Sequence, residues 1–358
     1  MKPLLSRILM TVAFAAAPTF ALAQAQPDLA LDAGTRAAVI DALIGQMNEK
    51  YVSPETAKQV ETLLRAELKG GKYDQLTSAS QFAKTLTDTL RESANDRHLQ
   101  VRFSPDPLPA RLEPDENDPA VDAEMARRVK FNSGVAHVER TRGNIGYLKV
   151  DFFPPAKHVA SVYGAAMTLL NGTEALIIDL RSNRGGDPNG VAALESYFFD
   201  KPTLMNTIFY RSGNKTEEYW TSAELKGPRY GQAKPVYILT SQKTFSGGED
   251  LAYSMQAQKR ATLIGASTGG GANPGGVQRL HTNFGAFISE GRAINPLTKT
   301  NWERVGVKPD IAAEPDDALR QARLLALKSI LDKNTDPRGR AELTKLLQDE
   351  TAAGGARN

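Results

Sequence analysis

Ser246 is the residue of this sequence whose surroundings most strongly suggest covalent chemistry. It lies in TSQKTFSGGEDLAY (240–253), where an apolar segment passes through two glycines into a segment with helical character. A serine in a glycine-flanked turn between a strand and a helix is where several hydrolases hold their nucleophile. Ser246 followed three residues later by Glu249 is also the capping-box pattern, in which the hydroxyl only satisfies a backbone N–H group. Both interpretations fit this stretch.

A nucleophilic serine needs a base, because its hydroxyl is a poor nucleophile at neutral pH. The chain has four histidines and no cysteine, which excludes a cysteine nucleophile, thiolate metal sites and disulfides. His98 stands out because it lies in NDRHLQVRF (95–103), where a helical region ends and a strand begins. A lone histidine is more often an ordinary hydrogen-bonded side chain. The other candidate bases are a desolvated lysine, His137, His158 and His281.

Two glycine-rich turns could stabilise the negative charge that develops during acyl transfer. Gly185 and Gly186 follow the most apolar segment of the chain, and Gly247 follows Ser246 directly. A backbone N–H group aimed at an oxyanion contributes roughly 3 kcal/mol to transition-state stabilisation. These glycines could equally form plain turns, as could GASTGGGANPGG (265–276). The latter is not a phosphate loop, since no lysine-serine/threonine pair follows its glycines.

Three further charged residues could take part in a site. Glu303 could orient the base, although it is most simply a solvated surface charge. Arg181 and Arg184 lie near the proposed oxyanion turn and could hold a substrate carboxylate in a bidentate grip. The alternative for the arginines is a structural pairing with Asp179 or Asp187.

Alternating strands and helices must position these stretches. Short apolar runs predict buried strands at 144–153, 174–180, 235–240 and 261–265. Helical patterns at 156–172 and 188–199 lie between them, so we expect an α/β domain with a largely parallel sheet. Because ligands bind beyond the carboxyl ends of such strands, the turns after Leu180 and Thr240 should meet at one edge.

The flanking regions have a different character. Apolar residues recur four apart within residues 34–95, which predicts three amphipathic helices that start and stop at signals such as Ser53-Pro54 and Gly70-Gly71. A Pro/Asp-rich connection follows at 104–120. A last amphipathic helix is expected at 316–331, and residues 351–358 are expected to be disordered.

Residues 1–23 have a basic start, an apolar stretch and a small-x-small ending, which predicts a secretory signal peptide cleaved after Ala23. The alternative is an N-terminal membrane anchor, but no other segment approaches the roughly 20 apolar residues of a membrane span. Removing Lys2 and Arg7 with this leader lowers the net charge from +3 to +1, and no basic stripe suggests nucleic-acid binding. We therefore expect a periplasmic or secreted bacterial protein without a stable membrane span after signal cleavage.

These features divide the chain into five predicted parts. They are a signal peptide (1–23), a helical N-terminal subdomain (24–103), a linker (104–134), an α/β catalytic domain (135–332) and a C-terminal helix with a disordered tail (333–358).

Taken together and in this order, the stretches resemble the tail-specific (C-terminal processing) serine peptidase family. The resemblance covers roughly residues 35–330 and is closest to the branch with tricorn protease and the interphotoreceptor retinoid-binding protein. Only about 40 residues separate Phe103 from Asn144, too few for the PDZ domain that better-known members carry there. No lysine lies between Lys259 and Lys299, where those members place the lysine of a Ser–Lys dyad. The matching motifs are NDRHLQV, LIIDLRSNRGGD, LTSQKTFSGGEDLAY, IGASTGGGANPGGVQRL and NWERVGVKPDI.

The resemblance implies a Clp protease/crotonase-like layered α/β core with a small helical N-terminal subdomain. It also implies peptide-bond hydrolysis through an acyl-enzyme, on a peptide or protein substrate and without a metal or organic cofactor. One alternative is a non-catalytic module that binds hydrophobic, retinoid- or lipid-like ligands on the same fold, and another is a different hydrolase or acyl-transfer activity. The implied site has Ser246 as the nucleophile, His98 as the general base and Glu303 as the acid that orients His98. Its oxyanion hole is formed by Gly247 with Gly186 or Gly185.

Overall fold

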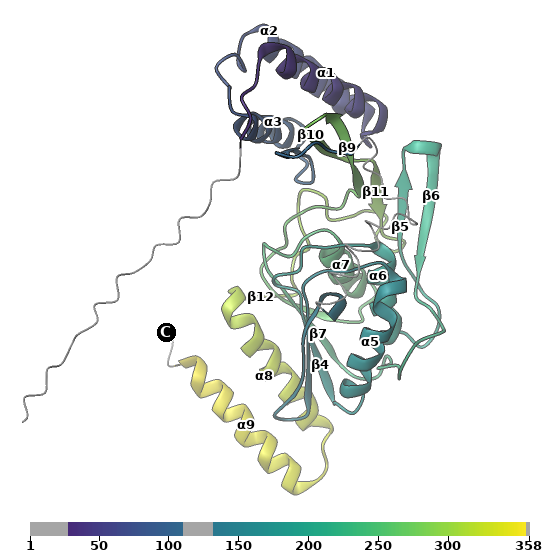
Figure 1. Cartoon of the computed structure of the whole chain (residues 1–358). Helices are drawn as coiled ribbons and strands as arrows, with labels where there is room; N and C mark the ends of the chain where they lie inside the picture. The colour runs from purple at the N-terminus through teal and green to yellow at the C-terminus, as the bar shows by residue number, and fades with distance from the viewer. Residues whose placement is uncertain (1–27, 110–131, 356–358) are drawn as a thin grey trace, which may run out of the picture.

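The computed structural model describes residues 28–109 and 132–355, which form a helical subdomain above a larger α/β core (Figure 1). The predicted signal peptide and most of the predicted linker lie outside these described residues.

The three predicted N-terminal helices are confirmed as α1 (Ala33–Lys50), α2 (Pro54–Lys69) and α3 (Ala79–Ala94). Each begins after a residue whose side chain accepts a backbone N–H of the first turn; these caps are Asp32, Ser53 and Ser78. Their apolar faces pack against a three-stranded antiparallel sheet in the order β1-β10-β9. Its strands are β1 (Gln100–Phe103), β9 (Gly275–His281) and β10 (Phe284–Ser289).

The boundary predicted for the N-terminal subdomain therefore needs correction. The hairpin of β9 and β10 comes from the region assigned to the catalytic domain, yet Phe284, Ala286 and Ile288 are buried in one cluster with residues of α1 and α3. The physical reason is that β1 has only four residues and needs partners for its backbone hydrogen bonds. The hairpin supplies them, so the two parts of the chain are joined by a shared sheet.

The core contains a six-stranded sheet in the order β12-β8-β7-β4-β3-β2, parallel except for the edge strand β2. This confirms the predicted strands, which are β3 (Ile145–Val150), β4 (Ala175–Asp179), β7 (Val236–Thr240) and β8 (Thr262–Gly265). The edges are β2 (Val135–Thr141), which follows a short 3₁₀ turn at Asn132–Gly134, and β12 (Ile311–Ala312).

Helices cover both faces of this sheet, which makes a three-layer core. One face packs against α5 (Ala156–Leu170), α6 (Pro188–Glu195) with the 3₁₀ turn Ser196–Phe198, and α7 (Gly247–Ala257). The other face packs against α8 (Pro315–Lys333) and α9 (Pro337–Gly355). The predicted disorder of residues 351–358 is wrong as far as Gly355, because the alanines after Thr351 favour continuation of α9.

A second antiparallel sheet was not predicted. It has the order β11-β5-β6 and consists of β5 (Leu204–Tyr210), β6 (Lys215–Trp220) and β11 (Gly291–Ile294), with a 3₁₀ turn at Ser212–Asn214. Because β11 follows β10 almost directly, this sheet continues from the hairpin that the helices cover. It forms one side of the cavity described next.

Candidate active site

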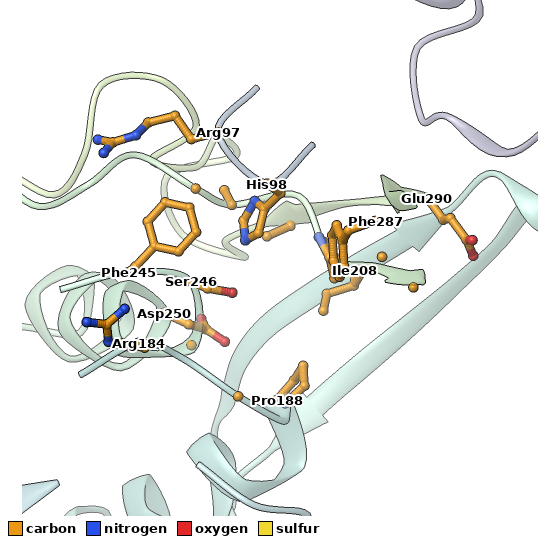
Figure 2. Close-up of a pocket in the computed structure, with 18 of the residues that line it drawn as sticks. Arg97, His98, Arg184, Pro188, Ile208, Phe245, Ser246, Asp250, Phe287 and Glu290 are labelled. Carbon is orange, nitrogen blue, oxygen red and sulfur yellow. The ribbon is translucent and has the colours of Figure 1, made fainter. Parts of the chain in front are cut away.

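A cavity of about 1050 Å³ opens where the turns after β4 and β7 meet the chain between α3 and β1. His98, Gly186, Ser246 and Gly247 all line it, so residues from three separate stretches of the sequence meet there. Figure 2 shows His98 and Ser246 on facing walls of this cavity. The site therefore lies between the helical subdomain, which supplies His98, and the core, which supplies Ser246.

Ser246 occupies an unusual backbone conformation at the start of α7. Its φ of 51° and ψ of −121° lie in a region that non-glycine residues rarely adopt. The Glu249 carboxylate accepts the Ser246 N–H at 2.8 Å, which is one half of the predicted capping box. Gly185 packs against this turn so closely that a Cβ there would lie 2.6 Å from the Ser246 Cβ. The local structure thus holds Ser246 in a strained turn between a strand and a helix, with its side chain at the cavity.

The two glycine turns differ in which N–H groups remain free. The Gly185 N–H donates to Asn183 Oδ1 at 2.8 Å. Among the described residues, no acceptor takes the N–H of Gly186 or of Gly247. These two groups are close together, since a Cβ on Gly247 would lie 3.1 Å from the Gly186 nitrogen. Of the glycines predicted for an oxyanion hole, Gly186 and Gly247 therefore have suitable donors, and Gly185 does not.

The His98 side chain is 9% exposed and lies among aromatic side chains. Its ring lies 4.6 Å from that of Phe245 and 5.8 Å from that of Phe287, measured between centroids. Burial lowers the pKa of His98, which favours the neutral imidazole that a general base requires. Neither ring nitrogen has a hydrogen-bond partner among the described residues. His98 is thus not the ordinary hydrogen-bonded histidine of the alternative interpretation, and no hydrogen bond joins it to Ser246 or Glu303 in this structure.

Glu303 is not a solvated surface charge. Its Oε2 accepts the backbone N–H groups of Ala272 at 2.6 Å and Asn273 at 3.2 Å, while Oε1 is buried without a partner in the described chain. Burial, and then the neighbouring carboxylate of Asp96, raises the pKa of Glu303 to about 7. Glu303 is not among the residues that line the cavity, whereas its neighbour Trp302 is.

Asp96 is a second buried acid beside the histidine, and the sequence reasoning missed it. Its Oδ1 accepts the backbone N–H of His98 at 2.9 Å and lies 3.9 Å from the His98 Nδ1. Its Oδ2 accepts the hydroxyl of Tyr51 at 3.2 Å. The signal available in the sequence was an aspartate two residues before a histidine, the spacing at which a carboxylate can bond the backbone ahead of it.

The glycine-rich loop 265–276 binds two carboxylates through its backbone. Gly270 and Gly271 donate their N–H groups to Glu249 at 2.6 and 2.9 Å, and the next two residues bind Glu303 as described. A Cβ on Gly271 would lie 2.6 Å from His98 Cε1, so glycine allows the histidine to approach. The loop thus connects the turn of Ser246 to the surroundings of His98.

The two predicted substrate-binding arginines have different environments. Arg181 forms a bidentate pair with Asp179, at 3.0 and 2.6 Å, and donates a third bond to the Pro315 carbonyl at 2.6 Å. Arg181 therefore has the structural pairing with Asp179 that was the alternative to substrate binding. It does not line the cavity. Arg184 is exposed and lines the cavity.

Two other classes of site have no support in the part of the chain that the structure describes. No group of three or more His, Asp or Glu side chains is arranged to hold a metal ion there. Likewise, none of the helices at 28–109 and 132–355 is long and apolar enough to cross a bilayer.

Comparison with protein families gives two matches in one chain. Residues 144–313 match the profile described as peptidase family S41. Residues 19–131 match the profile described as the N-terminal domain of Peptidase_S41 in eukaryotic IRBP. The second match covers α1–α3 and His98, and the first covers most of the core with Ser246 and the glycine turns.

Individual relatives agree with these matches. The chain is 26% identical over 207 residues to the carboxy-terminal processing protease CtpA of Bacillus subtilis, covering 55% of this chain and 41% of that one. It is 22% identical over 201 residues to the chloroplastic carboxyl-terminal-processing peptidase 1 of Arabidopsis thaliana, covering 55% and 40%. The matches therefore span less than half the length of these relatives.

Solved structures share the fold. A lipoprotein from Streptococcus agalactiae has a TM-score of 0.54 at 13% identity, covering 82% of this chain and 96% of that one. Mature CPAF has a TM-score of 0.52 at 13% identity, covering 84% and 98%. In both cases the similarity extends over the helical subdomain and the core together.

Proposed function

Because the chain belongs to peptidase family S41, we propose that it is an exported serine peptidase that cleaves peptide or protein substrates through an acyl-enzyme on Ser246. The observation that carries this proposal is the Ser246 turn itself. Its backbone is strained, its side chain lies at the cavity, and two free backbone N–H groups lie beside it. A residue that only capped a helix would need none of these features.

The reaction follows from the chemistry of the groups around the cavity. His98 takes the Ser246 proton while the serine oxygen attacks the substrate carbonyl carbon. The N–H groups of Gly186 and Gly247 stabilise the oxyanion of the tetrahedral intermediate, and the positive end of the α7 helix dipole adds to this stabilisation. His98 then protonates the leaving amine, and water repeats the sequence on the acyl-enzyme.

Glu303 is proposed as the acid that orients and stabilises the imidazolium. Its second oxygen, Oε1, has no partner among the described residues, and the carboxylate that lies 3.9 Å from His98 Nδ1 is that of Asp96. Catalytic hydrogen bonds are often long or unmade without substrate and tighten in the complex. Movement of the imidazole toward Glu303 would complete a Ser/His/Glu triad.

The cavity suits a peptide better than a hydrophobic ligand. Its lining carries more basic than acidic side chains, and Arg184 is free to bind a substrate carboxylate. A retinoid- or lipid-like ligand would need a mostly apolar lining. The basic lining residues are Arg91, Arg97, Arg102, Arg184 and Lys243.

Fluorophosphonate labelling of the purified chain, followed by peptide mapping, tests the proposal. We expect covalent modification at Ser246 that Ser246→Ala abolishes and that His98→Ala and Glu303→Gln slow, with each variant checked for folding. Absence of labelling in the folded protein would refute the peptidase and favour the non-catalytic binding module. Labelling that persists unchanged in His98→Ala would leave the nucleophile in place and refute the assigned base.

A further inference from the structure

Asp250 places a carboxyl group in the cavity wall one helical turn beyond Ser246. The two residues are four apart at the start of α7, so they lie on the same face of the helix. Asp250 lines the cavity although only 5% of the residue is exposed. Figure 2 shows its carboxylate on the cavity side of α7. Asp250 therefore contributes a carboxyl group to the wall of the cavity that Ser246 also lines.

The surrounding structure holds the Asp250 carboxyl without neutralising it. Its Oδ1 accepts hydrogen bonds from the Asn206 side-chain amide at 2.9 Å and from the Ser254 hydroxyl at 3.3 Å. No cation forms an ion pair with it among the residues that the structure describes. Removing one partner of a buried ion pair is costly because it leaves a buried charge uncompensated. Among the described residues, the Asp250 carboxylate therefore lacks the cationic partner that would stabilise it.

A second acid, Glu195, interacts with Asp250 but does not line the cavity. Glu195 on α6 is fully buried, and burial together with the charge of Asp250 raises its pKa well above the ordinary value. Burial raises the pKa of Asp250 from its ordinary value to about 6, and the hydrogen bonds from Asn206 and Ser254 partly oppose this rise. The acid that faces the cavity is therefore Asp250, while Glu195 is enclosed in the core.

Apolar side chains flank this carboxylate. Ile208 follows Asn206 on the same face of β5, and Ala293 is its partner across the sheet on β11. Trp302 contributes a buried ring, whose N–H is already donated to the Gly271 carbonyl at 2.8 Å. We call these residues the acidic slot; they are Asn206, Ile208, Asp250, Ala293 and Trp302, and all line the cavity.

We propose that the acidic slot binds the cationic side chain of a lysine or arginine in the substrate, at the residue whose carbonyl group Ser246 attacks. The inference rests on the proposed peptidase function and names the substrate class of that site. Apolar walls would contact the alkyl stem of such a side chain, while Asp250 would receive its charged end. The basic residues elsewhere in the lining repel cations, so the overall charge of the cavity cannot produce this preference.

The test compares two peptidyl diphenyl phosphonates that differ only at the residue next to phosphorus, which is lysine in one and norleucine in the other. Norleucine keeps the alkyl stem and lacks the ammonium group. We expect the full native chain to be inactivated at least about tenfold faster by the lysine probe, a difference of about 1.4 kcal/mol. Asp250→Asn should reduce this ratio at least about tenfold, and Asp250→Glu should restore part of it.

Glu290→Gln is the matched control, because Glu290 is another carboxylate of the cavity lining and lies far from Ser246 in Figure 2. It should keep the lysine preference. Modification of Ser246 at equal rates by both probes, or faster by the norleucine probe, would overturn the slot and leave the peptidase standing. No reaction of the folded chain with either probe would overturn the peptidase and the slot with it. Since the native chain decides these outcomes, misfolding of a variant does not remove the test.

Discussion

Replacing Glu303 by glutamine should stabilise the protein while it slows the chemistry. In the folded protein the pKa of this carboxyl is raised from its ordinary value of 4.5 to about 7, chiefly by burial and then by Asp96. Ionising it in the folded state above pH 7 therefore costs at most about 3 kcal/mol relative to ionising it in the unfolded chain. Glutamine cannot ionise, and its carbonyl oxygen can still accept the N–H groups of Ala272 and Asn273.

The size of this stabilisation depends on pH in a way that identifies its cause. Below about pH 4.5 the carboxyl is protonated in both states, so it contributes no ionisation penalty. Between pH 4.5 and 7 the unfolded chain has released this proton while the native state retains it, so the native state loses stability until the loss levels off above pH 7. The stability gained by Glu303→Gln should thus be near zero at pH 4.5 and approach about 3 kcal/mol at pH 8.

Urea unfolding of the native chain and of Glu303→Gln, measured from pH 4.5 to 8, gives this difference directly. Glu342→Gln on the exposed side of α9 is the control, and its effect should stay within about 0.5 kcal/mol at every pH. The same Glu303→Gln samples should react more slowly with fluorophosphonate. A stability difference that does not grow between pH 4.5 and 8 would refute the description of Glu303 as a carboxyl whose ionisation is opposed by burial.

Three further outcomes follow from the same geometry. Gly186→Ala should lower kcat for peptide cleavage by roughly 10²- to 10³-fold. The added Cβ would lie 2.0 Å from the Phe153 carbonyl oxygen, so the backbone would shift and displace the oxyanion donor. A near-normal kcat in a folded variant would exclude the Gly186 N–H as that donor. In Glu303→Gln, His98 is the member of the proposed triad that titrates in this pH range. The rate of fluorophosphonate labelling should stay level as the pH falls to below 6.5 and should then decrease, because burial lowers the pKa of His98. A decrease that begins above pH 6.5 would contradict this. Asp96→Asn should move this decrease in the labelling rate to lower pH and slow labelling by about tenfold, because a negative charge beside the imidazole is lost. An unchanged pH profile would leave Asp96 a purely structural role.

Much of the fold was readable in the sequence because it depends on local patterns. Apolar residues four apart predicted α1–α3, and Ser53-Pro54 marked a helix start through capping chemistry. Short apolar runs predicted β3, β4, β7 and β8 because a buried parallel strand is apolar on both faces. The antiparallel strands β5, β6, β9, β10 and β11 were missed because their residues alternate less clearly, and their stability comes from partners distant in the sequence.

The sequence by itself determined the candidate residues: a serine before two glycines, a histidine at the end of a helical region, and a glutamate beside a tryptophan. Their electrostatic state was decided only by tertiary structure. Burial of His98 against Phe245 lowers its pKa, and burial of Glu303 behind the glycine loop raises its own. Which glycine N–H groups remain free was likewise decided by a contact, the bond from Gly185 to Asn183. The physical reason is that desolvation and hydrogen-bond satisfaction depend on neighbours that the fold brings together from distant parts of the chain.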